Sequence, residues 1–361
     1  MARYDVIVML PQPPPVHGSS ETKRACARAI VERYGHDTLS YFGLRDSGTS
    51  CFDDTEKAFL SFKLWHGVAL VGADPIGPPD AIRDCTEQFL RFCELRKLTP
   101  CFLGVSGRNL EMYRALGLRI LKIGEECLIR LPSFDASKLK RKVRRAERHC
   151  LALGITSTMY APSGLPRASR DQVMLVSDEW IGARGGFERG FSMTLGRFPD
   201  ADDTDCRVLV ATQESRVIGF LTLMPVYQVR GWSLDMMRRA SDAPNGLTEF
   251  MIVQAARMLQ AEGWEFMSLN FASLSNTESE VFEPRAITIL RRFCFDYLSS
   301  VFQMKTLYTF NDKFQPEWAS RYVAFRHLSR VGTMLAAIIQ AEDPITLPSL
   351  GGMLRGAGEG G

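Results

Sequence analysis

The sequence predicts an α/β protein built from two tandem units, each made of strands with helices packed on them. Three observations support this fold class. The chain has 361 residues, more than one typical domain needs. Apolar stretches with strand-like and helix-like spacing follow one another along the chain. The pattern also occurs twice, once on each side of a basic stretch. The predicted divisions are a Pro-rich lead-in at 1–20, a first unit at 21–135, a basic linker helix at 136–152, a second unit at 153–340 and a flexible Gly-rich tail at 341–361.

The first unit begins with a helix over 22–34, where apolar residues recur at helical spacing and Gly35 supplies the stop. A Pro- and Gly-rich loop at 73–79 leads into another helix, at 81–97, whose apolar side chains form one stripe. The remaining predicted elements are strands at 38–44, 58–65, 68–71, 101–105 and 126–130, and a helix at 110–116 that Gly117 ends.

The second unit follows a basic helix over 136–152 and repeats the arrangement. Its clearest helix covers 247–261 and ends before Gly263. The other predicted elements are helices at 171–181 and 287–299, and strands at 207–212, 217–226, 231–237, 266–271 and, from its aromatic residues, 307–310.

Composition places the chain among ordinary globular proteins, with 45% hydrophobic and 24% charged residues. A net charge of +3 is mild, so an anionic partner must bind to a local patch. The nine cysteines include no C-x-x-C pair, which predicts reduced thiols in the cytoplasm and no metal site. No run of eighteen apolar residues and no signal cleavage site occur, so neither a membrane span nor a signal peptide is expected.

Several common catalytic motifs are missing from the sequence. It has no G-x-x-x-x-G-K-[ST] loop, no G-x-S-x-G elbow, no H-E-x-x-H and no dinucleotide fingerprint. The stretch 180–186 resembles a phosphate loop only superficially, because no clear helical pattern follows it. These absences weigh against ATP, NAD and metal-dependent hydrolysis.

A carboxylate interrupts the apolar strand predicted at 231–237. Asp235 shares a face with Ser233 and Met237, and an aspartate in so apolar a strand is costly unless it is paired or functional. We favour an active-site carboxylate over a structural partner of a nearby arginine. The turn at 241–246 could fold Arg238 or Arg239 back toward Asp235, although alternation alone puts Arg238 on the opposite face.

Three further polar residues have both a structural and a functional interpretation. Asn245 precedes the helix at 247–261, so it is either the helix cap or a substrate contact. Glu249 lies one turn into that helix, where the helix dipole alone would favour it. Lys313 lies between Phe310, Phe314 and Trp318. It is either a solvated loop residue or, as we favour, a cation aimed at a phosphate or a developing oxyanion.

The basic helix has a narrow apolar seam and is otherwise covered by cations. This density favours binding to a phosphate backbone or an anionic surface, with affinity but no base recognition. The cations are Lys138, Lys140, Arg141, Lys142, Arg144, Arg145 and Arg148.

Together these segments resemble the C-terminal catalytic domain of the phosphatidylglycerol lysyltransferase (multiple peptide resistance factor) family, from about residue 25 to 325. The stretch 268–272 is most similar to its actinobacterial branch. The segments that carry the resemblance are 36–45, 67–71, 74–78, 116–119, 122–126, 177–180, 188–193, 234–239 and 310–314.

The resemblance implies tandem GNAT-like domains, each a mixed sheet flanked by helices, with the second catalytic. It implies an aminoacyltransferase (EC 2.3.2.-) that moves an aminoacyl group from aminoacyl-tRNA to a hydroxyl, without another cofactor or a metal. The implied catalytic residues are Asp235, Arg238 and Lys313, and the candidate substrate-binding residues are Glu188, Arg239, Asn245, Glu249 and Asn270.

The chemistry suits these residue types, because an aminoacyl-tRNA ester is already activated. Asp235 could take the proton of the incoming hydroxyl or bind the α-ammonium group of the donor. Arg238 or Lys313 could stabilise the oxyanion or hold the terminal phosphate, and the basic helix would hold the tRNA acceptor stem. We therefore expect Asp235 and Lys313 to converge on one pocket in the second unit.

The acceptor stays open between two classes. The resemblance does not extend to the membrane-spanning half of the family, which slightly favours a soluble small molecule of a biosynthetic (natural-product) pathway, with a dedicated aminoacyl-tRNA synthetase as partner. The alternative is phosphatidylglycerol, reached by peripheral contact with the inner face of the membrane. A non-catalytic module that binds tRNA or anionic lipid is a second class of function. An acetyl-CoA-dependent enzyme is a third, weakened because a pyrophosphate loop is missing.

Overall fold

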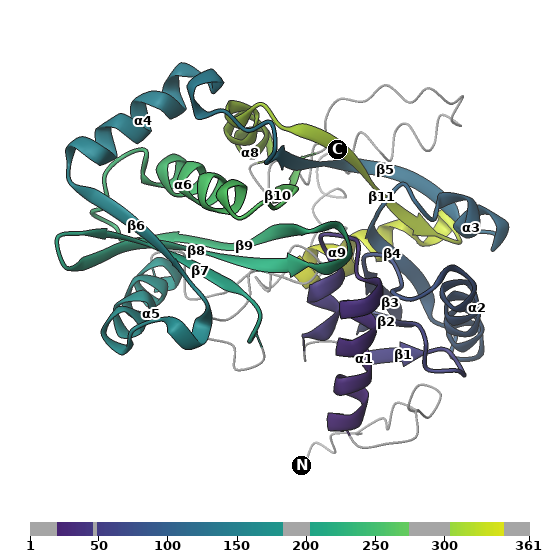
Figure 1. Cartoon of the computed structure of the whole chain (residues 1–361). Coiled ribbons are helices and arrows are strands. Elements are labelled where there is room, and N and C mark those ends of the chain that lie inside the picture. Colours follow the sequence, from purple (N-terminus) through teal and green to yellow (C-terminus); the bar gives the residue numbers. More distant parts are fainter. Residues whose placement is uncertain (1–19, 46–48, 183–202, 274–303, 343–361) are drawn as a thin grey trace, which may run out of the picture.

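The computed structural model describes residues 20–45, 49–182, 203–273 and 304–342. These residues form one eleven-stranded mixed sheet in the order β1-β2-β3-β4-β11-β5-β10-β9-β8-β7-β6 (Figure 1). The strands are β1 (Thr49–Phe52), β2 (Phe59–Trp65), β3 (Val68–Gly72), β4 (Thr99–Val105), β5 (Arg119–Arg130), β6 (Ile155–Tyr160), β7 (Arg207–Gln213), β8 (Arg216–Val226), β9 (Gly231–Arg239), β10 (Phe266–Ser273) and β11 (Glu317–Phe325).

Helices pack against this sheet and join its strands. The α-helices are α1 (Ser20–Tyr34), α2 (Pro79–Leu95), α3 (Leu110–Ala115), α4 (Arg141–Ala152), α5 (Arg167–Gly182), α6 (Leu247–Ala261), α8 (Met304–Asn311) and α9 (Val331–Glu342). Short 3₁₀ turns are η1 (Ser40–Leu44), η2 (Ala136–Lys138), η3 (Pro162–Gly164), η4 (Tyr227–Val229), η5 (Asp312–Phe314) and η6 (Leu328–Arg330).

In the half of the sheet formed by β6–β9, helices cover both faces. Figure 1 shows α4 and α6 on one side of these strands and α5 on the other. Strand β8 is therefore buried along nearly its whole length, which explains its almost uninterrupted apolar sequence. Gly219 of β8 leaves room for Leu247 and Met251 of α6, which marks that face as the α6 side.

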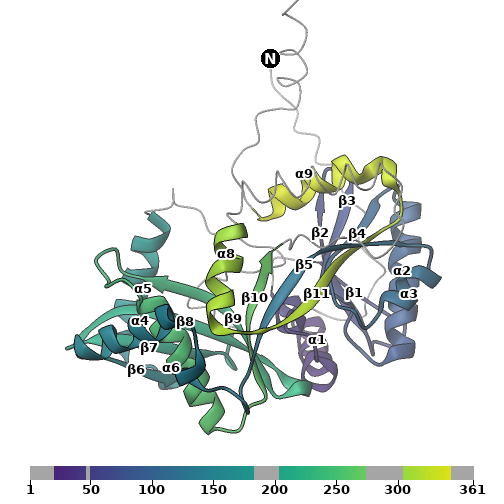
Figure 2. The ribbon, with the colours of Figure 1, turned by 90° about the horizontal axis from the view of Figure 1, so that it is seen from above.

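In the other half of the sheet, alternate side chains of each strand enter two separate cores. Val68 and Leu70 of β3 pack in the cluster that includes Met334 and Ala337 of α9. Ala69 and Val71 face the cluster that contains α2. Figure 2 shows α9 on one side of β2–β4 and α2 and α3 on the other.

Strand β11 comes from the C-terminal part of the described chain but lies between β4 and β5. It pairs antiparallel with both strands, with Phe325 opposite Cys101 of β4 and Arg119 of β5. This insertion places Arg321 near the middle of the continuous sheet. The division of the chain into tandem domains stays a prediction.

The predicted class, a mixed sheet with helices packed on both faces, is confirmed, and α6 has the predicted bounds. Two predicted strands are wrong. The aromatic stretch 307–310 belongs to helix α8, where Phe310 packs against Phe314 one turn on. The stretch 38–44 is largely the turn η1, because the Asp37 carboxylate accepts a hydrogen bond from the Leu39 amide.

Some predictions fall outside the described residues, namely the helix at 287–299 and nearly all of the segments 1–20 and 341–361. Within the described ranges, no helix combines the length and the apolar character that crossing a membrane requires. The sequence did not reveal β1, β6 and β11, which are short or half-polar.

We predict that Gly246→Ala destabilises the fold more than Gly263→Ala. Both glycines have positive φ, +93° and +77°, so each substitution costs about 1 kcal/mol of backbone strain. A Cβ at 246 would also lie 2.6 Å from the Cβ of Ala146, whereas a Cβ at 263 meets only Arg230 Nη2 at 4.0 Å. The clash with α4 adds about 1–3 kcal/mol. Urea unfolding of both variants measures the difference, and equal losses would contradict the close approach of α4 and α6.

Candidate active site

Asp235 is buried in β9 and forms an ion pair with Arg45, which follows the turn η1. Its side chain has 0% exposure, and its Oδ2 atom accepts a hydrogen bond from Arg45 Nη2 at 2.8 Å. Thr222 Oγ1 of β8 lies 3.4 Å from the same oxygen. An unpaired carboxylate would be costly at this depth, so the pair with Arg45 helps to stabilise Asp235 in its buried position.

Arg45 serves two carboxylates. Its Nη2 atom also lies 3.1 Å from Asp203 Oδ2, and the side chains of Arg45 and Asp203 are 11% and 8% exposed. The guanidinium lies 5.1 Å from the centre of the Phe42 ring, which helps to fix its direction. The arginine that pairs with Asp235 thus comes from the end of η1.

Arg238 is brought to the same face of the sheet as Asp235, contrary to simple alternation. Leu223 pairs with Leu234 and Leu221 pairs with Met237, so β9 has one residue more than β8 in this stretch. This bulge shifts the alternation by one residue. Arg238 is only 1% exposed and donates a hydrogen bond to Ser177 Oγ of α5. The prediction that alternation separates Asp235 from Arg238 is therefore wrong.

Lys313 does not join this cluster. Its Nζ atom lies 2.8 Å from Glu249 Oε1 of α6 and 4.6 Å from the centre of the Phe310 ring. Helix α6 and helix α5 lie on opposite sides of the sheet (Figure 1). The prediction that Asp235 and Lys313 converge on one pocket is therefore wrong, because Arg238, on the same face as Asp235, contacts α5, whereas Lys313 contacts α6. Two residues predicted separately, Lys313 and Glu249, instead pair with each other.

The remaining candidate residues have separate positions. Arg239 donates from Nη1 to the Ala243 carbonyl at 3.2 Å, which holds the turn after β9. Asn245 is exposed, and α6 is capped by Gly246 without a side-chain hydrogen bond, so Asn245 is not the helix cap. Glu188 lies outside the described residues. The catalytic and substrate-binding roles of all these residues stay predictions.

Asn270 holds β10 against β9 where their pairing ends. Regular pairing stops at Ser268 and Ser233. Asn270 has a φ of +65°, a conformation that asparagine tolerates better than most residues. Its Oδ1 atom accepts from Ser233 Oγ at 2.9 Å, and its Nδ2 atom donates to the Leu234 carbonyl. This amide thus connects β10 to the segment of β9 that carries Asp235.

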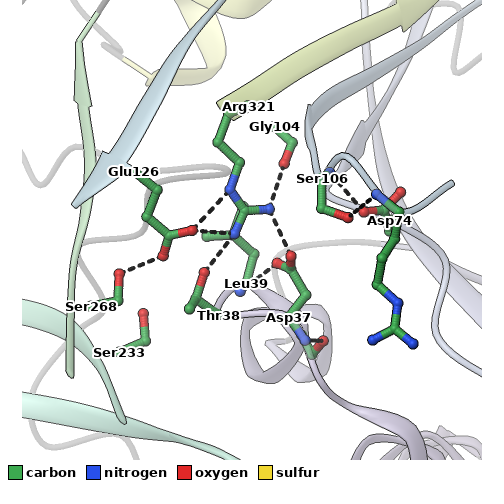
Figure 3. Close-up of polar contacts among 12 residues, drawn as sticks. Asp37, Thr38, Leu39, Asp74, Gly104, Ser106, Glu126, Ser233, Ser268 and Arg321 are labelled. Atoms are coloured by element: carbon green, nitrogen blue, oxygen red, sulfur yellow. Dashed lines mark hydrogen bonds and ion pairs between the residues drawn. The ribbon is translucent and has the colours of Figure 1, made fainter. Parts of the chain in front are cut away.

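A second polar cluster surrounds Arg321 of β11 (Figure 3). Its guanidinium donates to Glu126 from Nε at 3.0 Å and from Nη2 at 2.5 Å, and to Asp37 from Nη1 at 2.7 Å. Ser268 Oγ donates to the other oxygen of Glu126 at 2.5 Å. Although burial alone would lower the pKa of Arg321, the charges of Asp37 and Glu126 raise it above its ordinary value. Arg321 therefore stays charged at any physiological pH.

This second cluster lines a cavity of about 600 Å³. Its lining extends from exposed residues such as Glu265 to the buried Glu126 and Arg321. None of these residues was predicted from the sequence to belong to a site. Asp37 and Glu126 do lie in two segments that carry the family resemblance, whereas Arg321 is recognisable only once β11 is placed between β4 and β5.

The site offers acids and cations but no activated thiol. Burial, together with the nearby carboxylates Asp203 and Asp235, raises the pKa of the Cys206 thiol to about 12. Cys206 therefore stays a neutral thiol near pH 7 and is a poor nucleophile. Within the described ranges, His, Cys, Asp and Glu side chains form no cluster of three that could hold a metal ion. The arrangement suits proton transfer and the binding of charged groups.

The predicted basic surface is present. Lys138, Lys140 and all five basic residues of α4 named above are exposed, while Leu139 and Val143 are buried in the seam. Lys140 is paired with Asp312, next to Lys313. Among the described residues, Arg141, Lys142, Arg144 and Arg145 have no carboxylate partner. We call the seven exposed cations the basic face of α4.

The chain matches known proteins over most of its length. A family model described as "Phosphatidylglycerol lysyltransferase, C-terminal" matches residues 28–325. Proteins called "Lysylphosphatidylglycerol biosynthesis bifunctional protein LysX" are similar to it. The one from Mycobacterium ulcerans is 31% identical over 326 residues, and the one from Rhodococcus jostii is 33% identical over 332. These alignments cover 89% and 90% of this chain but only 29% of each relative.

Solved structures share the fold. The structure of L-PGS from Bacillus licheniformis superposes with a TM-score of 0.77 at 23% identity, covering 88% of this chain and 96% of that one. The C-terminal domain (DUF2156) of an Agrobacterium fabrum protein gives a TM-score of 0.75 at 24% identity, covering 89% and 97%. At these identities the similarity establishes the fold alone.

We predict that Arg45→Gln lowers the free energy of unfolding by about 3–5 kcal/mol, because it removes a cation that pairs with two buried carboxylates. The matched control is Arg216→Gln. Its partner Asp242 is 59% exposed, so that substitution should cost less than about 1 kcal/mol. Chemical denaturation followed by circular dichroism measures both. Similar small losses in the two variants would contradict a buried role for the Arg45 pair.

Proposed function

Because this chain belongs to the family described as phosphatidylglycerol lysyltransferase, C-terminal, we propose that it transfers an aminoacyl group from aminoacyl-tRNA to a hydroxyl acceptor. The match over residues 28–325 carries this proposal. The buried carboxylate of Asp235, held by Arg45, supplies a group suited to the chemistry. No metal or organic cofactor is needed, since the ester of the donor is already activated.

The reaction exchanges one ester for another. The acceptor oxygen attacks the carbonyl carbon, a new C–O bond forms, and the bond to the 3′-terminal ribose of the tRNA breaks. The proton of the acceptor hydroxyl passes to the ribose oxygen. We propose that Asp235 accepts this proton or binds the α-ammonium group of the donor. Arg238, buried against Ser177 and 5.3 Å from the centre of the Trp180 ring, is the nearby cation for a developing oxyanion.

Lys313 fits the tRNA better than the oxyanion. It follows α8, and its carbonyl accepts a hydrogen bond from the Lys140 amide at 3.4 Å, so it adjoins the basic face of α4. We therefore propose that Lys313 helps to hold the terminal phosphate of the tRNA. The basic face would bind the acceptor stem without base recognition.

For the acceptor, we propose phosphatidylglycerol and, for the carried amino acid, lysine. The names of the relatives support both, because they refer to lysylphosphatidylglycerol biosynthesis. Such an enzyme would work in the cytoplasm in peripheral contact with the membrane. A soluble hydroxyl-bearing molecule of a biosynthetic pathway, supplied through a dedicated aminoacyl-tRNA synthetase, is the alternative acceptor system. Offering labelled lysyl-tRNA with phosphatidylglycerol vesicles and with lipid-free extract, then identifying the labelled product, tests the proposal.

A non-catalytic module that binds tRNA or anionic lipid is a second candidate. The basic face of α4 favours it, because its unpaired arginines would bind phosphates whether or not transfer occurs. Turnover distinguishes the two candidates, since a binding module consumes no aminoacyl-tRNA.

We predict that Asp235→Asn lowers the rate of aminoacyl transfer by at least about a hundredfold, as expected for the loss of an acid–base group. The substitution keeps the shape of the side chain and removes its charge. Single-turnover transfer from labelled aminoacyl-tRNA measures the rate. Asp242→Asn, in an exposed ion pair after β9, is the control and should transfer normally. Full activity of Asp235→Asn would remove Asp235 from the mechanism.

We also predict that replacing Arg141, Arg144 and Arg145 together by Gln weakens tRNA binding at every ionic strength tested. Loss of three phosphate contacts should reduce the slope of log K against log salt by about 2 to 3. Filter binding across a salt series measures this slope. Glutamine at Arg83, Arg91 and Arg96 removes the same charge from exposed positions in and just after α2 and is the matched control. An unchanged slope in the α4 variant would show that tRNA binds elsewhere.

A further inference from the structure

The cavity beside Arg321 is large enough for a small organic molecule. Its volume is about 600 Å³, within the range of roughly 300–1,000 Å³ that is usual for ligand pockets. Its floor is formed by the middle of the sheet, with Glu126 of β5, Phe266 of β10 and Arg321 of β11. Its outer lining includes the exposed Gly107, Arg130 and Glu265.

The buried cation in this cavity has no donor left for a ligand. A guanidinium has five N–H groups, and in Arg321 each has a protein acceptor. Nε and Nη2 donate to Glu126, Nη2 also donates to Thr38 Oγ1 at 2.7 Å, and Nη1 donates to Asp37 and to the Gly104 carbonyl at 3.1 Å. Figure 3 shows these acceptors arranged around the guanidinium. A phosphate or carboxylate entering the cavity would therefore have to displace one of them.

The carboxylates in the lining, by contrast, retain capacity to accept hydrogen bonds. Two carboxylate oxygens accept about four bonds in total. Asp37 uses one bond to Arg321 and one to the Leu39 amide, at 2.7 and 2.9 Å. Among the described residues, the side chain of Glu265 has no partner. A ligand that donates hydrogen bonds is therefore matched by what the cavity offers.

Charge in the cavity favours the same kind of ligand. The lining contains the carboxylates Asp37, Glu126 and Glu265 but only two guanidinium groups. The second of these, Arg130, pairs with Glu317 at 2.7 Å. Burial raises the pKa of the neighbouring Asp74, and the charge of Asp37 raises it further.

We infer that this cavity binds a primary ammonium group of a small organic molecule and discriminates against phosphate and carboxylate groups. The inference follows from two observations. All N–H donors of Arg321 already have protein acceptors, and the carboxylates of Asp37 and Glu265 can accept further hydrogen bonds. It rests on the proposed function for the identity of the natural ligand, which would be the ammonium-bearing aminoacyl group. The basic face of α4 would then bind the phosphates, and the cavity would bind the positively charged ammonium group.

The test is direct binding to the full chain, without turnover. Isothermal titration calorimetry compares alaninamide, which has an ammonium and no carboxylate, with N-acetylalaninamide and with glycerol 3-phosphate. We expect alaninamide to bind, and acetylation to weaken binding by at least about tenfold, because it removes the charge-assisted hydrogen bonds. Glycerol 3-phosphate should bind more weakly than alaninamide.

Two variants locate the binding. Glu265→Gln alters an exposed side chain and should not disturb folding, yet it should weaken alaninamide binding by about three- to tenfold. Asp37→Asn tests whether the carboxylate at the buried end of the cavity also contributes to binding. Glu214→Gln, exposed in the β7–β8 turn and absent from the cavity lining, is the matched control and should bind normally.

Several results would overturn the inference. They are no alaninamide binding up to about 10 mM, equal binding of the acetylated compound, tighter binding of glycerol 3-phosphate, or unchanged binding in Glu265→Gln. Aminoacyl transfer without amine binding would reject the cavity and keep the proposed function. Amine binding to the cavity without any transfer would keep the inference about the cavity and reject the proposed function.

Discussion

Buried arginines from one part of the chain neutralise buried carboxylates from another, and the centre of the structure depends on these pairs. Arg45, at the end of η1, reaches Asp235 of β9, and Arg321 of β11 reaches Asp37 and Glu126. Charges at this depth are tolerated only when paired and hydrogen-bonded, and loss of one partner is far more damaging than loss of an exposed pair. The Arg45 pair therefore fixes the end of η1 against β9, and the Arg321 pairs fix β11 to β5 and to the segment before η1.

Irregularities in the strands bring these groups together. The bulge in β9 puts Asp235 and Arg238 on the same side of the sheet, although they are three residues apart. The left-handed Asn270 ties β10 to β9 where regular pairing ends. The insertion of β11 carries Arg321 to the centre. Each irregularity positions a polar side chain, and such irregularities are typical of functional sites.

This explains which features the sequence could predict. Helix α6 and the buried strands β8 and β9 were predictable because apolar periodicity determines them locally. Asp235 stood out because a carboxylate in an apolar strand needs a reason. Its partner Arg45 did not, since a contact across 190 residues leaves no local pattern. The face of Arg238 was mispredicted because a bulge changes alternation without a clear sequence signal. Lys313 was assigned to the wrong pocket because its aromatic neighbours fixed its surroundings but not its side of the sheet.

The division of charge between the two sides of the sheet constrains any mechanism. Arg141, Arg144 and Arg145, which have no carboxylate partner among the described residues, lie on α4, on the α6 side, whereas Arg238 contacts α5 on the other side, where Asp235 also lies. If the donor binds to α4 and reacts at Asp235, as proposed, its reactive end must reach the other side of the sheet. Pairing between β9 and β10 ends at Ser233 and Ser268, two residues before Asp235. The single-stranded end of the donor would have to pass near this point or around an edge of the sheet. We favour the first route, because Asn270 lies at that point and contacts the strand that carries Asp235.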